Sequence, residues 1–415
     1  MNRFKLFTIL TSAILTITYS GNIANAAVPK SFKFVGSGYG HGVGLSQIGA
    51  KGQALEGKSA TEILNYYFPG TSVVAVADTQ TIRVNTAHQI DSVSFTVVKE
   101  SSTAQGTFTL SSDTNTPVII NNSAKFTIES KSIAVQAKNL NLTSAGLWTI
   151  NIETGTYLVQ NVNGATLKLK YGVVQLRAVP VTGKGFHIEV TDSMRLHDEY
   201  LYGISEVPSM WPSAALQSQI IAARTYALSR MDAIKPSCDC NIYSSKYDQV
   251  YGGYTKELEP KYGAIWHQNV DATTVDSQSA LAITFNGAPI NVYFSSSSGG
   301  QTQRAIDVWG TEIPYLTSVP DPWSLDPKLN PKYYKWVRVI PQEKMAQAFS
   351  LPDVKKYVIN SRSKTGSVLK ITAYSSAGVK STLAVGIFKT AVKLPSSWFN
   401  QPPTITLEDS STVSN

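Results

Sequence analysis

Charged side chains are scarce in this chain, and cysteine and histidine are scarcer still. Asp, Glu, Lys and Arg make up 15% of the 415 residues, with two cysteines and five histidines. A low charged fraction beside plentiful Ser, Thr, Asn and Gly is typical of a β-rich extracellular protein rather than a cytosolic helical one. No basic run with interleaved aromatic residues occurs, which argues against a nucleic-acid partner.

The shortage of cysteine also limits the metal sites that the chain could build. Cys238 and Cys240 form a single C-x-C pair. A zinc site built from cysteine usually needs two such pairs or added histidines, and no histidine lies at metal-ligand spacing from this pair. A short disulfide loop is the favoured interpretation in an oxidising compartment. Zinc is disfavoured but left open, and we expect no cofactor.

Long apolar runs are missing after residue 26, so no later stretch is expected to span a bilayer. The first 26 residues differ and predict a secretory signal peptide. Arg3 and Lys5 precede an apolar stretch, Leu6–Ile17, and an A-N-A cleavage sequence at 24–26 follows. An uncleaved anchor helix is the alternative. We expect a secreted or cell-envelope protein, and its net charge of +8 favours an anionic wall or membrane surface.

A glycine-rich loop at residues 36–44 surrounds His41, but it lacks the G-K-[ST] of a P-loop and no nucleotide-binding fingerprint follows. Glycines on both sides of His41 allow a polymer or another segment of backbone to come close. We expect His41 either to bind substrate or to have an ordinary structural role.

The most informative stretch is residues 206–230, which reads E-V-P-S-M-W-P-S-A-A-L-Q-S-Q-I-I-A-A-R-T-Y-A-L-S-R. Glu206 stands in a short loop that Pro208 and Pro212 stiffen. Small and apolar residues then recur at helical spacing, which predicts an alanine-rich helix with Ser213 as its N-cap. Apolar neighbours can raise the pKa of a Glu by desolvation, as a general acid working near neutral pH requires. An ordinary surface carboxylate is the alternative.

The rest of the chain predicts a β-rich α+β fold. Residues 76–165 consist of short β-like runs separated by Ser, Thr, Asn and Gly, and we predict a β-rich accessory region there. Further strands follow from residue 166, and an N-G turn at Asn286–Gly287 predicts a hairpin. Near the end we predict helices at 342–349 and 354–359. The polar residues 401–415 are expected to form a disordered tail.

Several blocks resemble, in combination, the SpoIID/LytB family of cell-wall proteins. They are L-H-D-E-Y-L-Y-G-I-S-E-V-P-S-M-W-P-S-A-A-L-Q-S-Q-I-I-A-A-R-T-Y-A-L, D-Q-V-Y-G-G, N-V-Y-F-S-S-S-S-G-G-Q-T, V-W-G with P-Y-L-T-S-V-P-D-P-W, and G-Y-G-H-G-V-G-L-S-Q-I-G-A-K-G with I-L-N-Y-Y-F-P-G-T. Many members carry the last block at the C-terminal end, whereas here it comes first. The resemblance implies that residues 27–75 complete a SpoIID-like fold with a catalytic core at 166–400.

The resemblance also implies a function. The family includes lytic transglycosylases that cut glycan strands of peptidoglycan, notably strands stripped of peptides, and its catalytic Glu corresponds to Glu206. The implied substrate-binding residues are His41, Gln47, Arg224, Asp248, Gln249, Tyr251, Ser296 and Ser297. For Arg224 a structural ion pair is the alternative, and Asp248 is the candidate for a second carboxylate.

Two alternatives come with the family. Some members enhance a wall amidase, so a non-catalytic, wall-binding partner of an N-acetylmuramoyl-L-alanine amidase is the second hypothesis. Some members bind zinc through His and Cys residues near the D-Q-V-Y block. Here Asp248 precedes Gln249, and the two cysteines lie further upstream.

Overall fold

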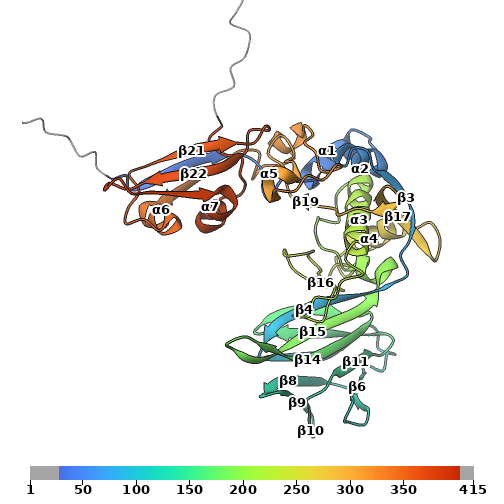
Figure 1. Cartoon of the computed structure of the whole chain (residues 1–415). Helices are drawn as coiled ribbons and strands as arrows, with labels where there is room; N and C mark the ends of the chain where they lie inside the picture. Colours follow the sequence, from blue (N-terminus) through green and yellow to red (C-terminus); the bar gives the residue numbers. More distant parts are fainter. Residues whose placement is uncertain (1–27, 402–415) are drawn as a thin grey trace, which may run out of the picture.

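The computed structural model describes residues 28–401, which form three parts: a helical centre, a β-sandwich and a C-terminal unit (Figure 1). The predicted signal peptide and most of the predicted tail lie outside the described residues. The β-rich α+β fold class is confirmed. Among residues 28–401, no helix is both long and apolar enough to cross a membrane.

The β-sandwich consists of a seven-stranded and a six-stranded sheet. The first has the order β16-β4-β15-β14-β11-β6-β7 and the second β10-β9-β8-β5-β12-β13. Their bounds are β4 Thr81–Ile90, β5 Ser92–Lys99, β6 Phe108–Ser112, β7 Val118–Ile120, β8 Ser123–Glu129, β9 Ser132–Ala137, β10 Leu140–Ser144, β11 Trp148–Ile152, β12 Thr156–Val162, β13 Ala165–Leu169, β14 Val173–Val181, β15 Gly185–Arg195 and β16 Ile242–Tyr243. Trp148 joins the two sheets, because its indole contacts Phe126 and donates to the Ile133 carbonyl.

The boundary expected between residues 165 and 166 falls inside this sandwich. β14 and β15 lie between β4 and β11 in one continuous sheet, so the strands before and after residue 165 share one core. The local sequence pattern shows where strands occur, but it does not show which distant strands pair.

The helical centre is built around α3 (Ser213–Leu228), most of whose residues are buried. The helix contacts α1 (Gln47–Leu55), α2 (Ala60–Tyr67), α4 (Tyr262–Asp271) and β17 (Ser279–Phe285). The prediction of Ser213 as the N-cap was wrong by one residue, because the helix begins at Ser213 itself, Pro212 holds the N-cap position and no side chain caps the helix. The smaller elements here are β2 Leu45–Ser46, β3 Ser72–Ala77, a π-helical turn Leu196–Tyr200, β18 Ala288–Pro289, β19 Phe294–Ser295, α5 Ala305–Trp309 and a 3-10 turn Pro322–Leu325.

The C-terminal unit has a hydrophobic core of its own. It combines β1 (Ser31–Gly36), which pairs with β20 (Trp336–Pro341), with a sheet in the order β21-β22-β23. The remaining bounds are α6 Gln342–Phe349, β21 Lys356–Arg362, β22 Val368–Tyr374, β23 Lys380–Ala384 and α7 Val385–Val392. The prediction of a helix at 354–359 was wrong. In this segment exposure alternates with a period of two, as in a strand covered on one face.

The glycine-rich block lies against the S-S-S-S segment although more than 200 residues separate them in the chain. β2 runs parallel to β19, and the backbones of Tyr39 and Ser297 exchange two hydrogen bonds. Gly44 has a positive φ of 72°, and a Cβ there would collide with the Tyr293 carbonyl oxygen. The rearranged order of blocks therefore still places the glycine-rich loop beside the centre of the fold.

Candidate active site

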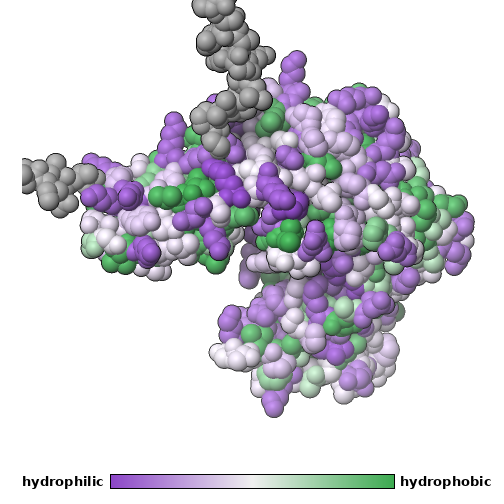
Figure 2. Space-filling view, turned by 45° about the horizontal axis from the view of Figure 1, so that its top comes forward, coloured by the Kyte–Doolittle hydropathy of each residue, from purple (hydrophilic) through white to green (hydrophobic). Residues whose placement is uncertain are grey.

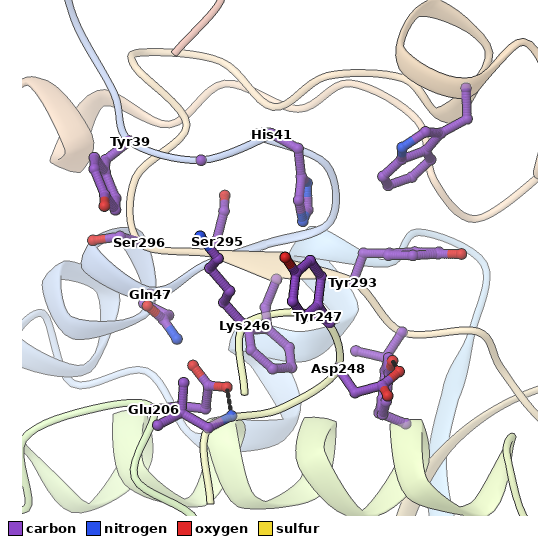
Figure 3. A pocket seen from close by; sticks show the side chains of 16 residues that line it. Tyr39, His41, Gln47, Glu206, Lys246, Tyr247, Asp248, Tyr293, Ser295 and Ser296 are labelled. Carbon is purple, nitrogen blue, oxygen red and sulfur yellow. Dashed lines mark hydrogen bonds between the residues drawn. The ribbon is translucent and has the colours of Figure 1, made fainter. Parts of the chain in front are cut away.

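A cavity of about 540 Å³ lies where the separate sequence blocks meet (Figure 3). Its walls come from the glycine-rich loop, the Glu206 loop, α3, the segment after β16, the segment around β19 and the end of α5. The lining residues are Tyr39, Gly40, His41, Gln47, Glu206, Tyr226, Lys246, Tyr247, Asp248, Val250, Val292, Tyr293, Phe294, Ser295, Ser296 and Trp309. The C-terminal unit and the sandwich project as separate lobes from the part that holds this cavity (Figure 2).

Glu206 lies at the floor of the cavity, in the loop directly before α3. Its Oε1 accepts a hydrogen bond of 2.6 Å from the Val250 backbone N–H (Figure 3). Burial raises the pKa of the Glu206 carboxyl, while the Val250 N–H and the Gln47 amide favour the ionised form and offset part of this rise. The net pKa is above the ordinary Glu value, so the carboxyl group can hold a proton nearer to neutral pH than an exposed glutamate can.

Asp248 is the only other acidic residue among those lining this cavity, and its oxygens are already engaged. Oδ1 accepts from the Tyr226 hydroxyl at 2.6 Å, and Oδ2 accepts from Lys235 Nζ at 2.9 Å and the Tyr243 N–H at 2.7 Å. Burial acts to raise the pKa of Asp248, but these three donors outweigh it and hold the pKa below its usual value. Asp248 is therefore an ionised carboxylate that orders the cavity wall.

His41 faces the cavity from the opposite side (Figure 3). Its Nδ1 accepts from the Val43 N–H at 3.0 Å. Burial, helped by nearby Lys389, lowers the His41 pKa to about 4, so the ring is neutral at pH 7. The ring contacts Trp309 at 5.3 Å between centroids, and Trp309 contacts Tyr293 at 4.4 Å. This side of the cavity is an uncharged aromatic wall.

The structure brings five of the predicted site residues together. Glu206, His41, Gln47, Asp248 and Ser296 all line the cavity, although they come from four separate segments of the chain. Gln47 also connects two helices, since its Nε2 donates to Gln219 Oε1 on α3 at 3.2 Å.

The remaining predicted residues do not line the cavity. Arg224 does not face the cavity, and its side chain is fully buried with Nε 2.9 Å from Asp78 Oδ2. This is the structural ion pair that the sequence left as an alternative. A fully buried guanidinium requires such a partner, and Asp78 provides it.

Gln249, Tyr251 and Ser297 are also buried, and each has partners within the protein. Gln249 bonds the Tyr200 hydroxyl and the Ala223 carbonyl, and Tyr251 stacks on Tyr200 with centroids 5.8 Å apart. Ser297 Oγ accepts from Asn330 at 2.9 Å. None of the three lines the cavity, and each contacts other parts of the protein instead.

Sequence reasoning missed most of the aromatic lining. The missed residues include Tyr39, Tyr226, Tyr247, Tyr293 and Trp309. Tyr247 is 80% exposed and Tyr39 46% exposed, so both offer ring faces to a ligand. The sequence did offer one signal for two of them. Tyr247 and Tyr293 stand in Y-D-Q-V and N-V-Y-F-S, within or next to blocks that resemble the same family as the Glu206 block.

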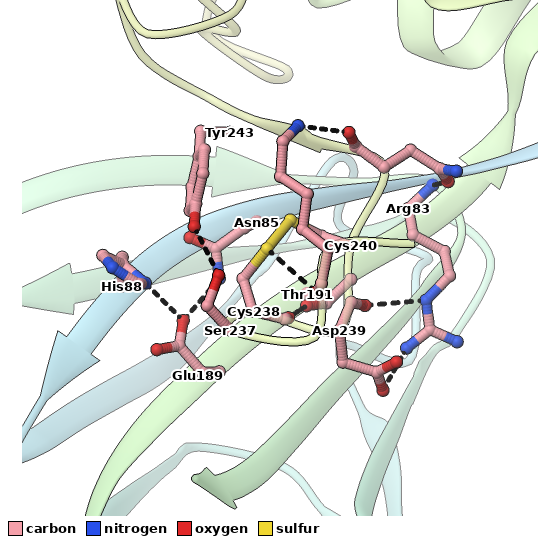
Figure 4. Close-up of a disulfide and its surroundings, with 12 residues drawn as sticks. Arg83, Asn85, His88, Glu189, Thr191, Ser237, Cys238, Asp239, Cys240 and Tyr243 are labelled. Carbon is pink, nitrogen blue, oxygen red and sulfur yellow. Dashed lines mark hydrogen bonds and ion pairs between the residues drawn. A yellow bond between two sulfur atoms is a disulfide. The ribbon is translucent and has the colours of Figure 1, made fainter. Parts of the chain in front are cut away.

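Cys238 and Cys240 are joined by a disulfide behind the cavity, and both are buried (Figure 4). The Cys240 carbonyl accepts a hydrogen bond of 2.8 Å from the backbone N–H of Lys235, whose Nζ in turn donates to Asp248. Because both sulfur atoms are used in the disulfide, they do not fit a zinc site as thiolate ligands. Within residues 28–401, no group of three or more His, Cys, Asp or Glu side chains is arranged to hold a metal ion.

A known protein family matches the part of the chain that contains Glu206. Residues 186–282 match the family model described as SpoIID, Stage II sporulation protein. The chain is 33% identical over 143 residues to Stage II sporulation protein D of Bacillus subtilis (strain 168), covering 33% of this chain and 40% of that protein. The corresponding protein of Bacillus amyloliquefaciens is 31% identical over 194 residues, or 44% of this chain and 54% of that protein.

A third similar protein has a different name. The amidase enhancer of Bacillus subtilis (strain 168) is 31% identical over 125 residues, which cover 30% of this chain and 15% of that protein. The chain thus spans about half of the sporulation proteins or less, and a smaller share of the enhancer. The matched segment contains Glu206, α3 and the segment after β16. The family model and these similar proteins confirm the resemblance to the SpoIID/LytB family over the segments that they match.

Proposed function

We propose that this protein acts on the bacterial cell wall, and that its cavity cleaves glycan strands of peptidoglycan as a lytic transglycosylase. The observation that carries the proposal is the contrast between two carboxyl groups in one cavity. Glu206 has a raised pKa and one oxygen without a backbone donor, while both oxygens of Asp248 are engaged. One group is suited to proton transfer and the other is not.

In the proposed mechanism Glu206 acts twice. Its protonated carboxyl donates to the glycosidic oxygen as the bond to C1 breaks and oxocarbenium character develops at C1. The resulting carboxylate then takes the proton from the C6 hydroxyl of the same sugar. The C6 oxygen forms a bond to C1 and closes an anhydro ring. Glu206 ends protonated, so the cycle needs neither water nor a second carboxylate.

Hydrolysis with retention would need a second carboxylate about 5–5.5 Å away as the nucleophile. Asp248 would have to give up hydrogen bonds to Tyr226, Lys235 or the Tyr243 backbone before attacking a sugar. The arrangement therefore favours the intramolecular reaction.

The cavity walls suit a polysaccharide. Exposed aromatic faces at Tyr39 and Tyr247 can stack on the apolar faces of sugar rings. The hydroxyls of Ser295 and Ser296 can hydrogen-bond to sugar hydroxyls. The signal peptide predicted at residues 1–26 would bring the protein to the cell envelope, where this substrate occurs.

A second candidate function is a non-catalytic role as a wall-binding enhancer of an amidase. The similarity to the amidase enhancer of Bacillus subtilis supports it. The same cavity would then hold a glycan strand without cleaving it, and Glu206 would have no chemical role.

The deciding experiment uses the mature protein and peptide-stripped glycan strands, with products identified by mass. Wild type should release fragments that end in anhydro-muramic acid. Glu206→Gln should lower the rate by at least about 100-fold, while Glu312→Gln, an exposed carboxylate outside the cavity, should leave it unchanged.

Identical products and rates from wild type and Glu206→Gln would overturn the enzyme proposal. If neither wild type nor Glu206→Gln cleaves the strands, and both proteins stimulate a wall amidase equally, the enhancer role is supported instead.

A further inference from the structure

A second cavity, of about 330 Å³, lies on the other side of His41 from Glu206. It is bounded by α5, by residues 367–369 at the start of β22, by the last residue of β23 and by the first turns of α7. His41 lines both cavities, so the two adjoin at this residue. The second cavity therefore places the C-terminal unit next to the candidate active site.

Lys389 is the only cationic residue among those lining this second cavity, since the His41 ring is neutral at pH 7. Its Nζ donates to the Gly40 carbonyl at 3.2 Å, which uses one of its three protons. Burial lowers the Lys389 pKa, in keeping with an ammonium group that is partly removed from water.

No acidic side chain neutralises this ammonium group. Within residues 28–401, Lys389 forms no ion pair with a carboxylate. Asp307 is the one acidic residue lining the cavity, and its carboxylate is paired with Arg304 through hydrogen bonds of 2.8 and 2.9 Å. A partly desolvated cation with free donors and no counter-ion favours an anionic ligand.

We propose that the second cavity is a subsite in which Lys389 binds a carboxylate carried by the glycan strand, on a sugar beyond the one that contacts Glu206. The inference rests on the proposed function, because it takes the same polymer as ligand. N-acetylmuramic acid carries a lactyl carboxyl group, which is a free anion once the peptide is removed and a neutral amide before. Lys389 would distinguish the two forms by charge.

The neutral His41 ring fits this arrangement. Because its pKa is about 4, it does not compete with Lys389 for the anion at pH 7. A Cβ on Gly40 would meet the Ser295 side chain at 2.7 Å and one on Gly42 would meet the Gln303 side chain at 3.2 Å, so both glycines allow the loop that carries His41 to pack closely against the protein. A purely structural role for Lys389, holding the Gly40 carbonyl, is the competing explanation.

The test separates these explanations by varying the charge of protein and ligand together. Affinities are measured in a Glu206→Gln background, which prevents turnover, for peptide-stripped strands and for the same strands with carboxyl groups converted to neutral methylamides. Lys389→Met should weaken binding of the carboxylate strands by about tenfold and leave binding of the amidated strands unchanged. Lys389→Arg should keep most of the affinity, and Lys344→Met on the exposed face of α6 should have no effect.

If Lys389→Met weakens the binding of both ligands equally, the proposal is overturned in favour of the structural role. If it weakens the binding of neither ligand, the proposal is overturned as well. The cleavage assay with Glu206→Gln is scored separately. Charge-dependent binding without any cleavage would uphold the subsite and reject only the enzyme proposal, whereas strands that fail to bind the wild-type cavity would reject both.

Discussion

Two opposing influences act on the single carboxyl group of Glu206. Burial raises its pKa, and the Val250 N–H and the Gln47 amide lower it. The balance leaves the pKa raised, which keeps the acid form available at higher pH than for an exposed Glu. The same two donors fix the orientation of the carboxyl group, so protonation and position depend on the same neighbours.

Replacing Gln47 with Leu should therefore change the pH dependence of activity. Gln47 favours the ionised form, so its loss should raise the Glu206 pKa further. Because the general acid must be protonated, kcat/KM falls as the pH rises through this pKa. In the Gln47→Leu variant, the descending limb of the pH profile of kcat/KM should therefore move to higher pH. Gln268→Leu, at an exposed position on α4, is the control and should leave the limb in place. A limb that moves to lower pH would contradict this assignment.

At the scale of the element, α3 is fixed by a buried ion pair rather than by a polar cap. Arg224 contacts Asp78, which follows β3, and also the Thr273 hydroxyl and the Leu281 carbonyl. Asp78 is itself fully buried and accepts from His197 at 2.6 Å. The pair therefore sets the position of the helix whose N-terminal loop carries Glu206.

Breaking this pair should be costly. Arg224→Met leaves the Asp78 charge buried with only His197 as a partner, and the free energy of unfolding should fall by about 3–5 kcal/mol. Denaturant titration of the purified variant measures the change. Adding Asp78→Asn should recover part of the loss, since it removes the uncompensated charge. If the Arg224→Met variant without Asp78→Asn were as stable as wild type, the ion pair would not be what fixes α3.

The sequence predicted the elements near Glu206 better than it predicted which polar side chains face the cavity. The proline-bounded loop and the alanine-rich helix follow from local rules, and both are present in the structure. Arg224 and Gln249 were assigned to the substrate, yet both are buried. Their partners Asp78 and Tyr200 come from other elements, and nothing in the local pattern shows that such partners exist.

At the scale of the whole molecule, the described chain contains two hydrophobic cores. One fills the sandwich and the helical centre, and the other fills the C-terminal unit. Phe34 in β1 belongs to the second core, where its ring packs against Phe388 and Phe399 with centroids 5.6 and 5.5 Å apart. The start of the described chain thus completes a unit formed mainly by its end, an arrangement that strand patterns alone could not reveal.

Two cores should give two thermal transitions. Phe34→Ala should destabilise the C-terminal unit by about 3–5 kcal/mol, and Trp148→Ala should destabilise the larger core by a similar amount. Differential scanning calorimetry should show each variant lowering the temperature of one transition. A single transition that both variants shift equally would contradict the division into two cooperative units.

The central claim is that Glu206 alone serves as acid and base, with the C6 hydroxyl of the sugar as the nucleophile. Cleavage of peptide-stripped strands in water enriched in ¹⁸O tests this most directly, with mass analysis of the new chain ends. We predict anhydro ends that carry no ¹⁸O, because no water enters the reaction. New reducing ends labelled with ¹⁸O would show hydrolysis and would contradict the account.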